Sequence, residues 1–202
     1  MLRLPIADGD LAALIVSTSF AAGLNVYATV ATLGLLGHYQ MVVLPDALNV
    51  ITSWWVIGAA AALFAIEFVA DKIPAFDLVW NALHTFVRVP VAALMAWAAT
   101  SHLSPQLQLL ATLGGGLIAF AAHGGKTAAR AAVTPSPEPV SNMTLSMGED
   151  VTAIGLTWIA TQHPYVAAGL VGIALVSTLL LMRWVVRAMK RLFAAPDATP
   201  AG

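Results

Sequence analysis

The chain has no cysteine and few charged residues: of its 202 residues, 9% are Asp, Glu, Lys or Arg. The absence of cysteine excludes disulfide bonds, thiolate catalysis, iron–sulfur clusters and cysteine-based zinc sites. Soluble globular domains are about 25% charged, so the low charge argues against that class. The formal net charge of −1 gives no bulk basic character, and we therefore expect no nucleic-acid partner.

Apolar residues dominate instead: 59% of the chain is hydrophobic, and the mean hydropathy is +0.84. A membrane's hydrocarbon core is about 30 Å thick, and a helix needs about 20 mostly apolar residues to cross it. The sequence therefore predicts an all-α integral membrane protein, with one polytopic domain over residues 1–193 and a flexible tail over residues 194–202. The first apolar run lacks the pattern of a cleaved signal peptide, so we read it as a retained span.

Six spans account for the apolar runs, and the basic residues suggest their orientation. Lys and Arg occur before the first span and after the second, fourth and sixth, whereas the other three connections contain neither. By the positive-inside rule, both termini are then cytoplasmic. Pro90 and Gly148 weaken the third and fifth helices, so we expect broken or half-inserted helices near them. The predicted spans cover residues 11–37, 50–70, 78–100, 106–122, 143–161 and 165–186.

Charged residues lie deep inside two of these spans. Arg88 is near the middle of the third, and Glu149 and Asp150 come early in the fifth. Such charges are rare in membranes, face the protein interior or a water-filled cavity, and need partners. Helical spacing also gathers polar residues into one stripe on the third span, namely Asp77, Asn81, His84 and Arg88.

These polar stripes predict one centre in the cytoplasmic half of the bundle. Its acidic and basic members nearly balance, and its histidines can titrate, which suits a proton relay. We expect no catalytic residue, metal site or cofactor there. The expected members of the centre are Asn25, Glu67, Asp71, Lys72, Asp77, His84, Arg88, His123, Lys126, Arg130, Asn142, Ser146, Glu149 and Asp150.

Two functions compete for this centre. The first is a small transporter or permeation pathway, proton-coupled and handling an anionic small molecule or a lipid head group. The second is a non-catalytic membrane scaffold or assembly protein whose buried ion pairs only fix the helices. An intramembrane enzyme is less favoured, because no Ser–His–Asp or HExxH spacing is present. In either case we expect membrane lipids as partners and assembly into a homo-oligomer.

A weak internal repeat relates residues 58–98 to residues 110–160, each a hairpin with a polar cytoplasmic turn. In this alignment Arg88 falls opposite Glu149. We therefore expect Glu149 and Asp150 to supply counter-charges to the first half. Chance similarity between alanine-rich helices is the alternative to a true repeat.

Several motifs together resemble a family of small bacterial membrane proteins, the domain of unknown function family 4126. The resemblance covers nearly the whole chain and implies a helical fold in the bacterial inner membrane, crossing it several times, but it carries no known activity. The matching motifs are "AGLNVY" at residues 22–27, "EFVADKIP" at 67–74, Asp77, His84, Arg88, His123, Lys126, Arg130, "TPSPEPVSN" at 134–142 and "SMGED" at 146–150.

Overall fold

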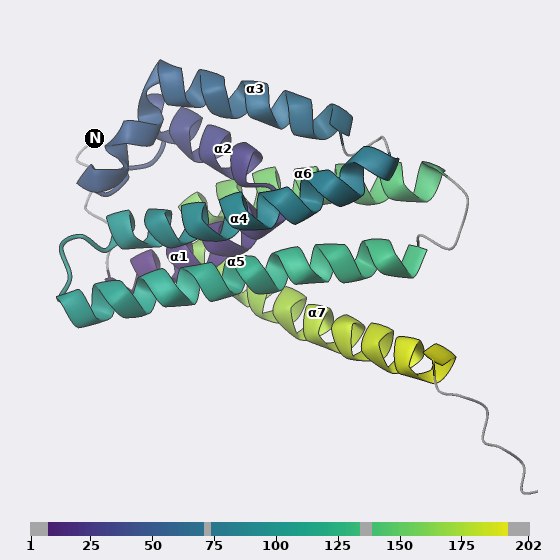
Figure 1. Ribbon diagram of the computed structural model, residues 1–202. Helices are drawn as coiled ribbons and strands as arrows, with labels where there is room; N and C mark the ends of the chain where they lie inside the picture. The colour runs from purple at the N-terminus through teal and green to yellow at the C-terminus, as the bar shows by residue number, and fades with distance from the viewer. Residues whose placement is uncertain (1–7, 71–73, 134–138, 194–202) are drawn as a thin grey trace, which may run out of the picture.

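A computed structural model describes residues 8–70, 74–133 and 139–193 of the chain, and these residues form helices and connecting turns (Figure 1). The all-helical prediction is confirmed. The helices are α1 (Asp8–Leu24), α2 (Val26–His38), the 3-10 helix η1 (Asp46–Thr52), α3 (Trp54–Ala70), α4 (Pro74–Ala99), α5 (Pro105–Val133), α6 (Pro139–Gln162) and α7 (Pro164–Phe193).

Proline sets the start of the four longest helices. Pro74, Pro105, Pro139 and Pro164 each occupy the first helical position. The fixed φ of proline suits that position, and its missing N–H would have no partner inside the helix. The sequence thereby defines where each long helix begins.

The first apolar run is not one span but two helices that meet at Asn25. This residue has an extended backbone, with φ −149° and ψ 104°, and its side chain accepts a hydrogen bond from the Ala28 N–H at 2.9 Å. It is therefore the N-cap of α2. The prediction of a continuous span over residues 11–37 is wrong, because an asparagine that can cap a new helix interrupts the apolar run.

The chain reverses direction at this break. Leu11, near the start of α1, lines a cavity together with Leu44 and Asp46, which follow α2. The start of α1 and the end of α2 therefore lie at the same end of the bundle, and Figure 1 shows the two helices as an open hairpin. We call this unit the α1–α2 hairpin.

Helix α1 occupies the centre of the molecule. Ala21 and Ala22 are fully buried, and Leu14, Phe20 and Leu24 belong to a core cluster with residues of α5, α6 and α7. A helix that is apolar on every side is expected to be buried in this way. The hairpin is thus enclosed by the long helices.

The described chain begins and ends at opposite ends of the bundle. A Cβ added to Gly9, at the start of α1, would meet the hydroxyl of Tyr165, at the start of α7. Helix α7 has 30 residues and carries the chain about 45 Å away from that point. The expectation that both termini are cytoplasmic stays a prediction, since it also depends on residues 1–7 and 194–202, which lie outside the described part.

The predicted breaks near Pro90 and Gly148 are wrong, whereas the half-inserted alternative stays a prediction. Helix α4 continues through Pro90, and α6 continues through Gly148. One proline removes one helical hydrogen bond, and one glycine costs about 1 kcal/mol, so neighbouring helices can hold both segments in helical form. The break lies instead at Asn25, where the side chain replaces the lost backbone bond.

By length and composition, the described residues support a membrane protein with fewer spans than expected. Two segments, Pro105–Arg130 and Pro164–Ala188, are long and apolar enough to cross a membrane. A third crossing is possible if Asp46–Thr52 and Trp54–Ala70, which meet at 62°, count as one span. Six spans are not reached on this criterion.

Close packing of α1 on α5 depends on Gly23. A Cβ there would collide with the carbonyl oxygen of Ala119 and lie 2.7 Å from the Cβ of Ala122. We predict that Gly23→Ala destabilises the protein by about 1–3 kcal/mol, the usual cost of overpacking, measured as a lower melting temperature in detergent. Gly148→Ala is the matched control, since nothing lies within 4 Å of its added Cβ; equal melting temperatures for the two variants would contradict this packing.

Candidate functional site

The predicted polar residues converge on the tip of the α1–α2 hairpin. Helices α3, α4, α5 and α6 each contribute side chains, and we call the resulting set the charged centre. None of the following members is more than 6% exposed: Asn25, Glu67, His84, Arg88, His123, Lys126, Arg130, Ser146 and Asp150. Glu149 completes the centre, with its side chain 11% exposed.

The most deeply buried charges form an ion pair. Arg88 Nη2 of α4 donates to Glu67 Oε1 of α3, and both side chains are fully buried. The second carboxylate oxygen, Glu67 Oε2, is also buried and has no hydrogen-bond partner among the described residues. Buried polar atoms normally have a partner, so this oxygen marks the side of the pair where the centre can accept a further donor.

Arg88 also fixes the tautomer of His123. Arg88 Nη1 lies 2.9 Å from His123 Nδ1, and Thr85 Oγ1 lies 2.7 Å from His123 Nε2. A guanidinium can only donate, so Nδ1 must accept and the ring proton must be on Nε2. We therefore assign a neutral His123 that donates to Thr85.

A second histidine connects α4 to the hairpin. His84 Nε2 lies 3.1 Å from the hydroxyl of Tyr27, near the start of α2. The two rings meet edge to face, with centroids 5.6 Å apart. The first turn of α2 therefore lies against the same centre as Arg88.

The second half of the centre is a three-residue charge cluster between α5 and α6. Glu149 Oε2 lies 2.9 Å from Lys126 Nζ and 3.0 Å from Arg130 Nη2. Lys126 and Arg130 are one turn apart on α5, so one carboxylate bridges both. This geometry holds the C-terminal part of α5 to the N-terminal part of α6.

Asn25 attaches the hairpin tip to α6. Its Nδ2 donates to Asp150 Oδ1 at 2.8 Å, while its Oδ1 accepts from the Ala28 N–H. The two bonds together fix the orientation of the amide. Asn25 therefore both starts α2 and connects it to the charged centre.

The structure corrects one predicted pairing. Arg88 and Glu149 were expected to neutralise each other, but Arg88 pairs with Glu67, and Glu149 pairs with Lys126 and Arg130. Counter-charges are thus found inside each helix pair, α3 with α4 and α5 with α6. The two pairs meet where His123 of α5 contacts Arg88 of α4, and sequence spacing could not reveal which carboxylate each basic side chain takes.

The other predicted members have different outcomes. Ser146 is fully buried on α6 beside the centre. Asp71 and Lys72 lie outside the described residues, and the side chains of Asp77 and Asn142 are not described either. Two contributors were missed, Tyr27 and Thr85. Tyr27 follows Asn25 by two residues, so an N-cap reading of "GLNVY" would have placed it in the first turn of a helix.

The described carboxylates of the centre match its described Lys and Arg side chains in number. Three cations, Arg88, Lys126 and Arg130, face three anions, Glu67, Glu149 and Asp150, and the assigned tautomer of His123 is neutral. Among the described residues, no cluster of three His, Asp or Glu side chains could hold a metal ion. Two cavities of about 300 and 290 Å³ lie elsewhere in the bundle.

The model of a family described as a domain of unknown function (DUF4126) matches residues 12–185. The chain belongs to the DUF4126 family. The resemblance noted from the sequence is confirmed, and the matched DUF4126 region includes the hairpin tip and every described member of the charged centre. No curated protein and no solved structure matches the chain.

The Glu67–Arg88 pair yields a stability prediction for this DUF4126 protein. Glu67→Leu removes the counter-charge of a buried guanidinium, and we expect a loss of about 3–5 kcal/mol. Glu67→Leu combined with Arg88→Met removes both charges and should recover most of that loss. Thermal unfolding in detergent measures the cycle.

Arg183→Gln is the control for this cycle, because Arg183 is exposed on α7 and its replacement should change stability by less than about 0.5 kcal/mol. Additive effects of Glu67→Leu and Arg88→Met, with no recovery in the double variant, would mean that the two side chains do not stabilise each other.

Proposed function

We propose that this protein transports a small anion together with a proton across the bacterial inner membrane. The observation that carries the proposal is the position of the hairpin tip: a helix break at Asn25, fully buried, in contact with Asp150 of a charged centre. Non-helical backbone at membrane depth is tolerated where it is buried in protein or lines a cavity. Transporters use such broken helices to build substrate sites.

We infer five crossings and one re-entrant hairpin in place of six spans, with α4 and α6 counted by their length in addition to the three candidate spans. Helices α4 to α7 have 26, 29, 24 and 30 residues, each long enough for about 30 Å of hydrocarbon, and η1 with α3 supplies the fifth crossing. The basic residues Lys126, Arg130, Arg187 and Lys190 lie toward the end of the bundle where α5 and α7 finish, which we take as the cytoplasmic side. The hairpin then enters from the outer side and returns to it.

The balance of charge indicates what such a site would carry. A net charge in a medium of low polarity is costly, and the described carboxylates of the centre already match its described Lys and Arg side chains in number. A monovalent anion that binds with one proton adds no net charge to the centre. Transport of the pair is therefore electroneutral.

His123 is the residue best placed to receive that proton. Protonation at Nδ1 turns this atom into a donor, which breaks its bond with Arg88 Nη1 because both atoms would then donate. Arg88 becomes available to hold carboxylate or phosphate oxygens, for which a guanidinium is well suited. Loss of the proton restores the Arg88–His123 bond and releases the anion.

One observation favours the alternative, a scaffold with structural ion pairs. Glu67 pairs with Arg88 and Glu149 pairs with Lys126 and Arg130, as a purely structural network requires. Buried pairs of this kind are conceivable without any solute. Charge-reversed partners distinguish the two functions. The double variant Glu67→Arg with Arg88→Glu should recover folding whether the protein is a scaffold or a transporter. A scaffold should also recover its function, whereas a transporter should not recover flux.

Flux in proteoliposomes tests the proposal directly. Vesicles loaded with a pH-sensitive dye receive an inward gradient of chloride, inorganic phosphate or lactate. We predict that at least one of these anions acidifies the lumen faster than in protein-free vesicles, with a rate that does not change when valinomycin and potassium set the membrane potential. Arg88→Lys should reduce the rate at least tenfold, since a lysine lacks the planar fork.

Arg183→Gln serves as the matched control and should retain the wild-type rate, because this exposed residue lies far from the centre in sequence and on another helix. Acidification that is equal in wild type, Arg88→Lys and protein-free vesicles for all three anions would overturn the assignment.

A further inference from the structure

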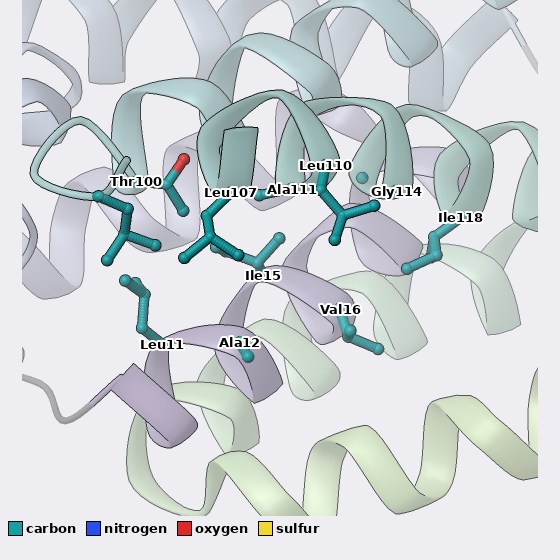
Figure 2. A pocket seen from close by; sticks show the side chains of 12 residues that line it. Leu11, Ala12, Ile15, Val16, Thr100, Leu107, Leu110, Ala111, Gly114 and Ile118 are labelled. Carbon is teal, nitrogen blue, oxygen red and sulfur yellow. The ribbon is translucent and has the colours of Figure 1, made fainter. Parts of the chain in front are cut away.

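A second region of the bundle, away from the charged centre, contains an apolar cavity. A cavity of about 300 Å³ lies between α1 and the first half of α5, and Figure 2 shows side chains of the two helices on opposite walls. We call it the α1–α5 groove. Its walls include Leu11, Ile15 and Val16 of α1 and Leu107, Leu110 and Gly114 of α5.

The chemistry of the walls excludes a polar ligand. Thr100 is the one polar side chain in the lining, and its hydroxyl donates to the Ala96 carbonyl at 2.7 Å. The groove therefore offers a bound molecule dispersion contacts and apolar burial but no side chain dedicated to a hydrogen bond. An apolar cavity of this kind is not a stable place for water.

The mouth of the groove faces the side of the bundle that would contact lipid. Leu107 and Leu110 are 52% and 67% exposed, and both belong to the segment Pro105–Arg130, which is long and apolar enough to cross a membrane. The surface of a membrane-spanning segment is surrounded by lipid hydrocarbon. An acyl chain is therefore the molecule available to fill the groove.

The shape of the groove suits an acyl chain. Its volume of about 300 Å³ lies along α1 and the first half of α5. A flexible chain one methylene wide can follow this space and make dispersion contacts with both walls.

We infer that the α1–α5 groove binds one acyl chain of a membrane phospholipid. The groove lies in the half of α5 away from Lys126 and Arg130, so under the positive-inside orientation the lipid comes from the outer leaflet. A methylene that moves from the bilayer into this groove passes from one apolar environment to another and gains only packing contacts. The groove therefore selects the geometry of the acyl chain and not the chemistry of the head group. The inference is independent of the transport proposal.

Gly114 provides the variant for the test. Nothing lies within 4 Å of a Cβ added at this residue, and the residue lines the groove. Gly114→Leu therefore fills the space without a collision at Cβ. Gly172→Leu on α7 is the matched control, because its added Cβ also has nothing within 4 Å and the residue is absent from the groove lining.

Photo-crosslinking measures occupancy. The full chain is reconstituted in phosphatidylethanolamine and phosphatidylglycerol vesicles with a trace of phosphatidylcholine that carries a diazirine on one acyl chain. After irradiation, we expect labelled peptides to concentrate around residues 11–16 and 107–118. Gly114→Leu should lower that labelling at least fivefold, and Gly172→Leu should leave it unchanged.

Two results would overturn the inference. The first is labelling of the same peptides that is equal in wild type, Gly114→Leu and Ala12→Leu, which fills the groove from α1 and keeps the test valid if one variant fails to fold. The second is occupation by another copy: because the chain has no cysteine, Leu110→Cys would then form a disulfide-linked dimer in vesicles, and we expect it to stay monomeric on oxidation.

Discussion

The fold depends on the need to partner every charge that lies inside an apolar bundle. Arg88 and Glu67 are fully buried, on helices that otherwise show apolar side chains to their surroundings. Helix α3 has few other buried residues, namely Ile57, Ala60 and Ala70. The ion pair therefore does much to place α3, and removal of one partner would leave a charge that the bundle cannot solvate.

The same requirement explains why the α1–α2 hairpin and the charged centre occur together. A helix break inside the bundle exposes backbone groups that need partners, and Asn25 supplies one of them while its amide binds Asp150. Tyr27 adds a second connection, to His84. The centre therefore holds the hairpin tip in place through α6 and α4.

Composition and depth were sufficient to predict the helical membrane fold and nine of the buried residues, because an intramembrane charge has few acceptable environments. The pairing was not predictable: Arg88 and Glu149 looked complementary in sequence, yet the carboxylate that pairs with Arg88 is Glu67. The break was missed at Asn25 and expected at Pro90, since residue type alone cannot say whether neighbouring helices hold a proline in helical form. An N-cap asparagine inside an apolar run was the overlooked signal.

Transport through this protein requires that water and solutes reach the charged centre. The chain has no cysteine, so single cysteines report accessibility cleanly. Ser146 and Thr157 are both fully buried on α6, and eleven residues, about three turns, place them on one face. A membrane-impermeant methanethiosulfonate should modify Ser146→Cys, at a rate lowered by a transported anion, and leave Thr157→Cys unmodified. If both cysteines stay unmodified in the folded protein, the centre is a dry structural network and the transport account is contradicted.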